Sequence, residues 1–249
     1  MIKYGYSKRS LNSVDLHIYK LLKSQVSLKQ VINEPHFSCK SIKEVFPKSV
    51  KLTKSYGHDR PLPSYLVVYH RITMKPIFIT NYCYFIDGAW NRNYGEIQGR
   101  CQGEYLDNRP DQIQWVSGVL TKDFHLKHGY FASWDYEGTD VLLGYSPALV
   151  TIHESVLLNF ESVTNDKFSS IKEERPLIST ACGLIKVTHK NTQTCIMEDN
   201  ESISIMVVDG PLTPQVISTW VYGEGIFELA FGDSGGSSYA YYYPENDVQ

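Results

Sequence analysis

Apolar and aromatic residues are densest between Ser64 and Asp87, where their order predicts a β-hairpin. Leu66–Tyr69 is rich in β-branched and aromatic residues, and so is Pro76–Thr80. The polar segment Arg71–Lys75 between them has the length of a hairpin turn. The apolar residues come in short blocks and not in strict alternation, which is typical of strands buried on both faces. We therefore expect this hairpin in the core of a β-domain.

Residues 10–32 have a different pattern, which predicts an amphipathic helix. Asn12 can cap its N-terminus, and Asp15 three residues later completes a pair that resembles a capping box. The lysines lie off the apolar face, which comprises Val14, Ile18, Leu21 and Leu22. Docking on a protein is the common fate of a basic amphipathic helix, so we expect these four residues to act in assembly.

Pro35 ends the predicted helix. Residues 35–63 are polar, rich in lysine and interrupted by prolines, which predicts an extended arm with one short helical turn at Ser41–Phe46. We therefore divide the chain into an N-terminal helix and basic arm, residues 1–63, and a body, residues 64–249.

The body continues with a long surface loop, residues 88–112, and then with a series of short apolar runs. Turn signals separate these runs about every ten residues, which is typical of an antiparallel β-sandwich. The predicted strands are Ile113–Leu120, Gly129–Trp134, Asp140–Leu143, Ala148–Phe160, Leu184–His189, Thr194–Met197, Ser202–Val208, Val216–Tyr222 and Ile226–Phe231. A short helix is expected near Lys167–Glu174. The predicted fold class is mainly β: an antiparallel β-sandwich with an N-terminal amphipathic helix on an extended arm.

The net charge of −3 is unevenly distributed along the 249 residues. Residues 1–60 hold 12 of the 24 Lys and Arg but four acids, whereas after Lys190 there are nine acids and neither Lys nor Arg. A basic arm suggests a nucleic-acid or membrane partner, but the acidic body of a second copy would suit it equally well. The five cysteines include no C-x-x-C pair, which indicates reduced thiols in a cytosolic protein.

The strongest catalytic pattern is the pentapeptide Gly232–Gly236, which resembles the nucleophile loop of trypsin-like serine proteases with Ser234 as nucleophile. Its surroundings do not fit, because 15 residues follow Ser234 and no histidine lies in a matching segment. We interpret the pentapeptide as a turn. Cys182 and His189 have no third catalytic partner, and the eight histidines show no ligand spacing. The sequence therefore predicts no catalytic, cofactor or metal site.

Tyrosine is the most abundant aromatic residue, with 18 Tyr against 10 Phe and 4 Trp. A tyrosine can bury its ring and still offer a hydroxyl group to a partner, so it suits extensive protein–protein contact, although β-domains also favour it. We expect a cluster near the C-terminus to act in assembly: Tyr239, Tyr241, Tyr242 and Tyr243.

Three stretches resemble a known family: Ser64–Tyr69 with Pro76–Asn81, Ala181–Lys186, and Glu201–Gly210. Together with the tyrosine content and length, they are similar to the polyhedrins of cypoviruses. The resemblance implies a structural protein without catalysis that forms homotrimers and crystallises as occlusion bodies in the host-cell cytoplasm. It also implies virus particles as partners, the N-terminal helix as a clamp, and dissolution at alkaline pH. Members of this family can carry nucleotide, but no residue here places such a site.

Two other classes of function stay open. One is a serine hydrolase that uses Ser234, and the other is a soluble binding module that acts through the basic arm. We expect no membrane partner, because no window approaches about 18 consecutive apolar residues.

Overall fold

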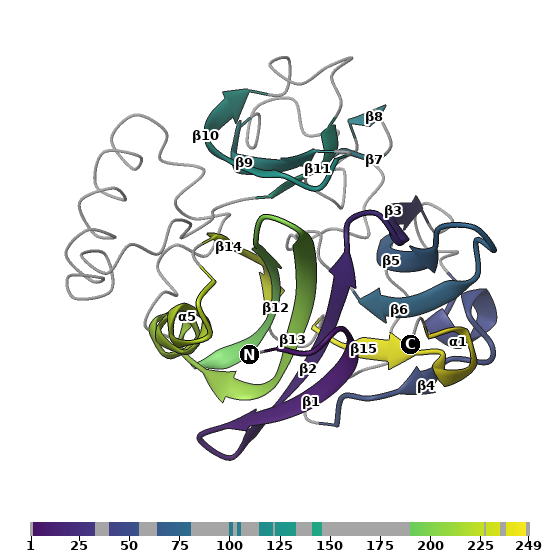
Figure 1. Cartoon of the computed structure of the whole chain (residues 1–249), viewed down its shortest axis with the longest axis horizontal. Helices are drawn as coiled ribbons and strands as arrows, with labels where there is room; N and C mark the ends of the chain where they lie inside the picture. The colour runs from purple at the N-terminus through teal and green to yellow at the C-terminus, as the bar shows by residue number, and fades with distance from the viewer. Residues whose placement is uncertain are drawn as a thin grey trace.

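The computed structural model describes residues 2–32, 40–54, 64–80, 100–101, 104–105, 115–121, 123–132, 141–145, 190–226, 228–234 and 238–247. Two five-stranded sheets dominate the described residues, and every strand pairing within them is antiparallel (Figure 1). The prediction of a mainly β, antiparallel fold is therefore confirmed.

The first sheet, sheet A, combines the two ends of the chain. Its strand order is β1 (Gly5–Leu11), β2 (Val14–Leu22), β13 (Ser202–Leu212), β12 (Asn191–Glu198) and β14 (Glu228–Ser234). The second sheet, sheet B, has the order β3 (Val26–Ile32), β5 (Ser64–His70), β6 (Pro76–Thr80), β15 (Ala240–Tyr242) and β4 (Val50–Lys51).

The remaining elements are smaller. A three-stranded sheet has the order β10 (Leu126–Ala132), β9 (Trp115–Thr121) and β11 (Val141–Tyr145), and a two-stranded ladder pairs β7 (Arg100–Cys101) with β8 (Glu104–Tyr105). The helices are α1 (Ile42–Val45), α5 (Pro214–Gly223) and the 3-10 turn η5 (Pro244–Asn246). Among the described residues, no helix is long and apolar enough to cross a membrane.

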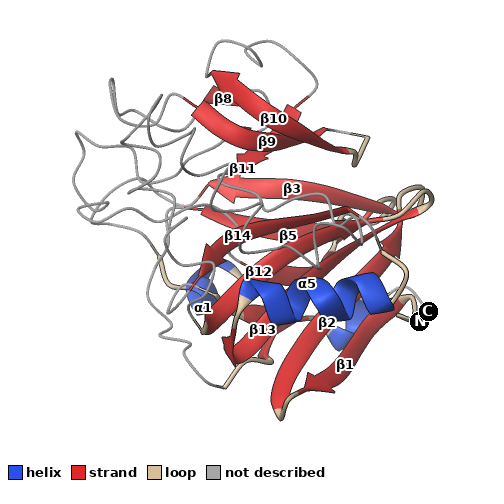
Figure 2. Cartoon of the chain, turned by 90° about the vertical axis from the view of Figure 1, so that its left-hand side faces the viewer, coloured by secondary structure: helices blue, strands red, loops and turns tan. Residues whose placement is uncertain are grey.

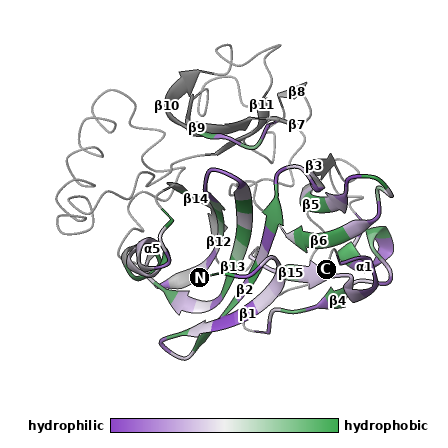
Figure 3. Cartoon of the chain, in the orientation of Figure 1, coloured by the Kyte–Doolittle hydropathy of each residue, from purple (hydrophilic) through white to green (hydrophobic). Residues whose placement is uncertain are grey.

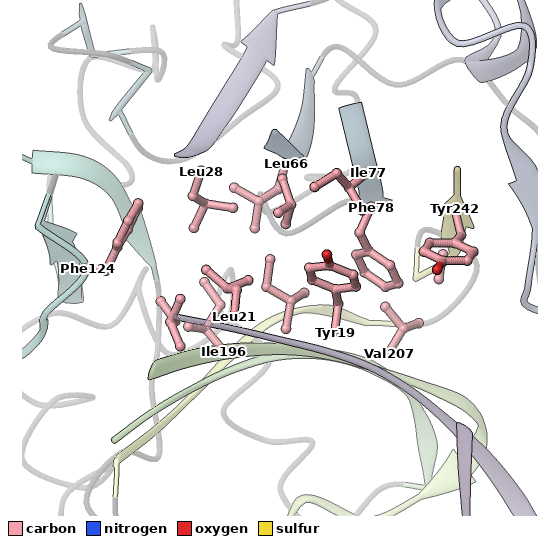
Figure 4. Packing of buried hydrophobic residues seen from close by; sticks show 14 of the residues in the cluster. Tyr19, Leu21, Leu28, Leu66, Ile77, Phe78, Phe124, Ile196, Val207 and Tyr242 are labelled. Atoms are coloured by element: carbon pink, nitrogen blue, oxygen red, sulfur yellow. The ribbon is translucent and has the colours of Figure 1, made fainter. Parts of the chain in front are cut away.

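Successive side chains of the central strands point to opposite faces of each sheet, so the sandwich has three apolar cores. The inner core lies between the sheets and includes Tyr19, Phe78 and Val207 (Figure 4). The outer core of sheet A is covered by Ile217 and Val221 of α5, which crosses that sheet (Figure 2). The outer core of sheet B packs beside α1. Figure 3 colours the chain by hydropathy, and hydrophobic residues, in green, recur along β6 and β13.

The turn between β9 and β10 is attached to the sandwich through Glu198, a buried residue at the end of β12. Its carboxylate accepts a hydrogen bond of 2.6 Å from the backbone N–H of Leu126 and pairs with Lys23 Nζ at 2.5 Å. His125 Nδ1 lies 2.6 Å from the same carboxylate. The neighbouring Phe124 enters the inner core, so charge and apolar packing both anchor the small sheet.

The predicted helix at residues 10–32 is wrong, because this segment forms β1, β2 and β3. Asn12 and Ser13 have φ values of 49° and 64° and connect β1 to β2, which is the conformation of a two-residue type I′ hairpin turn. In β2, Ile18 faces the outer core of sheet A and Leu21 faces the inner core. A strand buried on both faces can therefore mimic helical spacing.

The predicted strand Val216–Tyr222 is also wrong, because it lies within α5. The side chain of Thr213 accepts a hydrogen bond from the backbone N–H of Val216, and Pro214 occupies the first turn. This start signal, together with the burial of Ile217 and Val221 on one helical face, outweighs the β propensity of the segment.

The central hairpin is confirmed, since β5 pairs with β6 and both bury residues on their two faces. The short helical turn is confirmed as α1, where Ser41 and Glu44 form a capping box. The boundary at residue 63 stays a prediction, although β2 pairs with β13 and β3 pairs with β5 across it.

Most of the other predicted strands overlap observed ones, namely β9, β10, β11, β12, β13 and β14. The loop at residues 88–112 contains β7 and β8 among its described residues. The strands predicted at Ala148–Phe160 and Leu184–His189, and the helix predicted near Lys167–Glu174, lie outside the described residues.

Candidate metal centre

Three chemically active side chains come together where β2 and β13 pair. Asp15 lies directly opposite Asp209 in the antiparallel register, and His17 lies two residues further along β2. Residues at this spacing share one face of the sheet, which here is the face that bears Tyr19 and the inner core. One potential ligand atom from each of Asp15, His17 and Asp209 lies within 4.8 Å of the others. We call this group the Asp15–His17–Asp209 cluster.

His17 is the central member of the cluster, and its side chain is 3% exposed. Its Nδ1 lies 2.9 Å from the phenolic oxygen of Tyr6 on β1, and the two rings are nearly parallel, at an interplanar angle of 9°. Its Nε2 makes no hydrogen bond and lies 3.6 Å from Asp209 Oδ2, which is beyond hydrogen-bond range. The imidazole is thus held through one nitrogen, while the other nitrogen faces a carboxylate.

Either direction of the Tyr6–His17 hydrogen bond leaves Nε2 unsatisfied. If Nδ1–H donates to the phenolic oxygen, Nε2 carries a lone pair next to the carboxylate of Asp209. If the phenol donates to Nδ1, Nε2 carries a proton and the nearest carboxylate oxygen is too distant for a hydrogen bond. A buried polar atom in this situation costs free energy unless a further group satisfies it.

The two carboxylates of the cluster differ in their surroundings. The side chain of Asp209 is 3% exposed, and its Oδ2 accepts a hydrogen bond of 2.6 Å from the backbone N–H of Lys54, which follows β4. The side chain of Asp15 is 30% exposed, and its Oδ2 pairs with Lys8 Nζ at 2.6 Å. The cluster is therefore fixed at Asp209 and reaches solvent at Asp15.

Tyr6 connects the cluster to the aromatic part of the inner core. Its ring lies 4.8 Å from that of Tyr242, measured between centroids. Burial and the negative charge of Asp15 raise the pKa of the Tyr6 phenol above its usual value. Tyr6 consequently stays a neutral hydrogen-bond partner of His17 at physiological pH.

The distances within the cluster approach those of a metal site. A tetrahedral cation bound to nitrogen and oxygen at about 2.0–2.2 Å separates neighbouring ligand atoms by roughly 3.4 Å. The 3.6 Å between His17 Nε2 and Asp209 Oδ2 is close to that value. Asp15, the partly exposed member of the cluster beside the β1–β2 turn, would have to move closer to the other two. An imidazole with two carboxylates suits Zn²⁺ or Mn²⁺.

The residues expected to act in assembly do not form one surface. Ile18 and Leu21 are buried on opposite faces of sheet A, and Val14 and Leu22 are partly buried. Tyr242 lies in the inner core, whereas the outer core of sheet B contains Tyr239, Tyr241 and Tyr243. The role of these residues in assembly stays a prediction, and the single chain already buries most of their surface.

The pentapeptide around Ser234 is placed differently from the expected turn. Gly232, Asp233 and Ser234 are the last residues of β14, and Ser234 lies opposite Gln193 of β12. The turn prediction is therefore wrong for these three positions. Cys182 and His189 lie outside the described residues.

Sequence reasoning expected no metal site and missed the cluster, because two of its members lie in the segment interpreted as a helix. The signal was present in the order Asp15-Leu16-His17, which places a carboxylate and an imidazole on one face once the segment is a strand. Asp209 lies almost 200 residues later in the chain, and it is the pairing of β13 with β2 that brings it to the other two.

The sequence matches no protein-family model and no curated protein at a significant level. Among solved structures, it is similar to the catalytic domain of zebrafish N-acetylglucosamine-1-phosphodiester alpha-N-acetylglucosaminidase, auto-inhibited by its pro-peptide. The TM-score is 0.44 at 15% identity, over 94% of this chain and 71% of the other. A hypothetical protein from Synechocystis is similar with a TM-score of 0.39 at 11% identity, over 94% of this chain and 56% of the other.

Proposed function

We propose that the protein binds a divalent transition-metal cation through Asp15, His17 and Asp209. The observation that carries this proposal is Nε2 of His17, which is buried, makes no hydrogen bond and lies 3.6 Å from a buried carboxylate oxygen. A cation between these atoms would satisfy the imidazole lone pair and offset the negative charge of Asp209. The competing explanation is a protonated His17 that pairs with Asp209.

Two further features favour the cation. The three candidate ligand residues lie on β2 and β13, two paired strands inside sheet A, and such rigid elements hold a metal site in place. Tyr6 contacts the nitrogen of His17 that would not bind the cation, and metal-bound histidines are usually oriented through this second nitrogen.

The ligand set points to a class of chemistry. Three protein ligands leave at least one coordination position open, which is the arrangement of catalytic and not of structural zinc sites. A cation bound in this way lowers the pKa of a coordinated water to near neutrality. The partly exposed Asp15 gives water access to the edge of the cluster. Metal-assisted hydrolysis is therefore the reaction class that we assign to the cluster.

Isothermal titration of the full chain with Zn²⁺ and, separately, Mn²⁺ after treatment with a chelator tests the proposal. We expect one cation per chain, and binding at least tenfold weaker in Asp15→Asn, which is partly exposed and should not disturb the fold. Glu201→Gln, an exposed acid of the β12–β13 turn, is the matched control and should bind as the unaltered chain does. A chain that binds neither cation, or equal binding in Asp15→Asn, would refute the proposal.

Self-assembly into occlusion bodies stays a prediction that rests on the sequence resemblance. Its direct test is expression in insect cells followed by a search for intracellular crystals. We rank the metal centre above it, because the tyrosines that motivated assembly pack within the chain itself.

A further inference from the structure

Lys8 on β1 belongs to the same face as the Asp15–His17–Asp209 cluster. It lies directly opposite His17 in the β1–β2 register, so the two side chains project to the same side of sheet A. Its Nζ lies 2.6 Å from Asp15 Oδ2, and its side chain is 46% exposed. Lys8 is therefore a partly exposed positive charge on the most accessible carboxylate of the cluster.

We infer that Lys8 is a built-in competitor of the cation, which holds Asp15 in the metal-free state and leaves it when the cation binds. This inference rests on the function proposed above. Its basis is the charge of the site: Asp15 and Asp209 together neutralise a divalent cation, so the ammonium group of Lys8 is in excess once the cation is bound.

The geometry also distinguishes a Lys8 that competes with the cation from a Lys8 that orients Asp15 as a ligand. Asp15 has to approach the other two residues to become a ligand, because the ligand atoms of the cluster lie within 4.8 Å of one another and the pair near metal-ligand spacing, at 3.6 Å, is His17 Nε2 with Asp209 Oδ2. A Lys8 side chain that followed this movement would bring its ammonium group close to the cation, where like charges repel. The alternative, in which Lys8 stays on Oδ2 of Asp15 and orients the carboxylate, requires that repulsion to be tolerated.

The two roles predict opposite effects of removing the charge. If Lys8 competes, Lys8→Met should bind the cation about three- to tenfold more tightly, because an exposed ion pair and a like-charge repulsion no longer oppose binding. If Lys8 orients Asp15, the same substitution should weaken binding. Competition sets the cation concentration at which the site fills, so Lys8 would tune the affinity of the metal centre.

Arg9→Met is the matched control. Arg9 is the next residue of β1 and lies opposite Leu16, on the other face of the sheet, and the substitution removes the same charge from the chain. Titration of the three full-length proteins with Zn²⁺ should give tighter binding in Lys8→Met and unchanged binding in Arg9→Met.

A second measurement is independent of the absolute affinity. Without cation, Lys8→Met should melt slightly below the unaltered chain, and saturating Zn²⁺ should raise its melting temperature by more. Equal or weaker binding in Lys8→Met, with binding by the unaltered chain intact, would overturn the competitor role and leave the metal centre standing. If no protein binds the cation, the proposed function fails and the competitor role fails with it.

Discussion

Nδ1 of His17 lies 2.9 Å from the phenolic oxygen of Tyr6, and this contact ties the edge strand β1 to the Asp15–His17–Asp209 cluster on β2 and β13. Tyr6→Phe removes the contact and keeps the ring. We expect cation affinity to fall by about 10- to 100-fold, because the imidazole loses the group that orients it. Zn²⁺ titration measures the change, and Tyr4→Phe, at a side chain that is 52% exposed, is the control. Equal affinity in Tyr6→Phe would show that Tyr6 does not orient His17.

Deletion of residues 1–32 should prevent folding. The deletion removes β1 and β2 from sheet A, which leaves β13 without its neighbour β2, and it removes the edge strand β3 from sheet B. It also takes several fully buried side chains out of the cores, among them Leu16, Ile18 and Tyr19. Circular dichroism should show no cooperative thermal transition in the truncated chain. A truncated chain that melts near the temperature of the full chain would contradict the strand assignment and restore the predicted separate arm.

Ser13→Gly should stabilise the protein by about 1 kcal/mol, because Ser13 has a φ of 64°, which glycine adopts without steric cost. The opposite change at another turn provides the comparison. Gly225 has a φ of 82° with no atom within 4 Å of an added Cβ, so Gly225→Ala should destabilise by about 1 kcal/mol through backbone strain alone. Urea unfolding measures both variants, and a loss of stability in Ser13→Gly would exclude the type I′ turn.

Thr213→Ala should lower the free energy of unfolding by about 1 kcal/mol, because Thr213 caps the N-terminus of α5 with its hydroxyl group. Thr213→Ser keeps that hydroxyl group and should retain most of the stability. Urea unfolding of the two variants separates the cap from the side-chain packing. Equal losses in both would mean that the hydrogen bond to Val216 contributes nothing.

The sequence predicts the parts of the fold in which local pattern and burial agree. The β5–β6 hairpin combines blocks of β-branched residues with a turn of the right length, and α1 has its capping box in the sequence. It misleads where a strand is buried on both faces. In β2, Leu16 and Ile18 serve one core while Tyr19 and Leu21 serve another, and this removes the alternation that identifies a strand.

The Asp15–His17–Asp209 cluster was beyond prediction for a related reason. Asp15 and His17 share a face only if residues 14–22 form a strand, and Asp209 joins them only through the β2–β13 register. The Asn12-Ser13 turn was the local signal that could have revealed the strand, because asparagine tolerates a positive φ. The C-terminal tyrosines show the converse case: their number was visible in the sequence, but their burial depends on two different cores.

Two buried phenols, those of Tyr242 and Tyr19, share the carboxylate of Asp247. Tyr242 donates a hydrogen bond of 2.5 Å to Asp247 Oδ2, and Tyr19 donates one of 2.6 Å to Oδ1 of the same carboxylate. Burial, the hydrogen bond to Asp247 and the charge of Asp247 all raise the pKa of Tyr242. Burial likewise raises the pKa values of Tyr6, Tyr69 and Tyr243.

A raised pKa means that the folded chain binds the phenolic proton more tightly than the unfolded chain. The resulting contribution to stability is complete below the unfolded pKa of about 10 and is lost as the pH rises toward the folded value. We therefore expect the free energy of unfolding to be steady near neutral pH and to fall steeply above a pH of about 10.

Tyr242→Phe should be less stable at pH 7, by about 1.5–3 kcal/mol, because Asp247 loses a charge-assisted hydrogen bond. The same variant should lose less stability as the pH rises above about 10, because it lacks the phenol whose pKa is raised. Urea unfolding across this range measures both effects, with Tyr4→Phe as the exposed control. Parallel losses in the unaltered chain and in Tyr242→Phe would show that Tyr242 does not govern the alkaline transition.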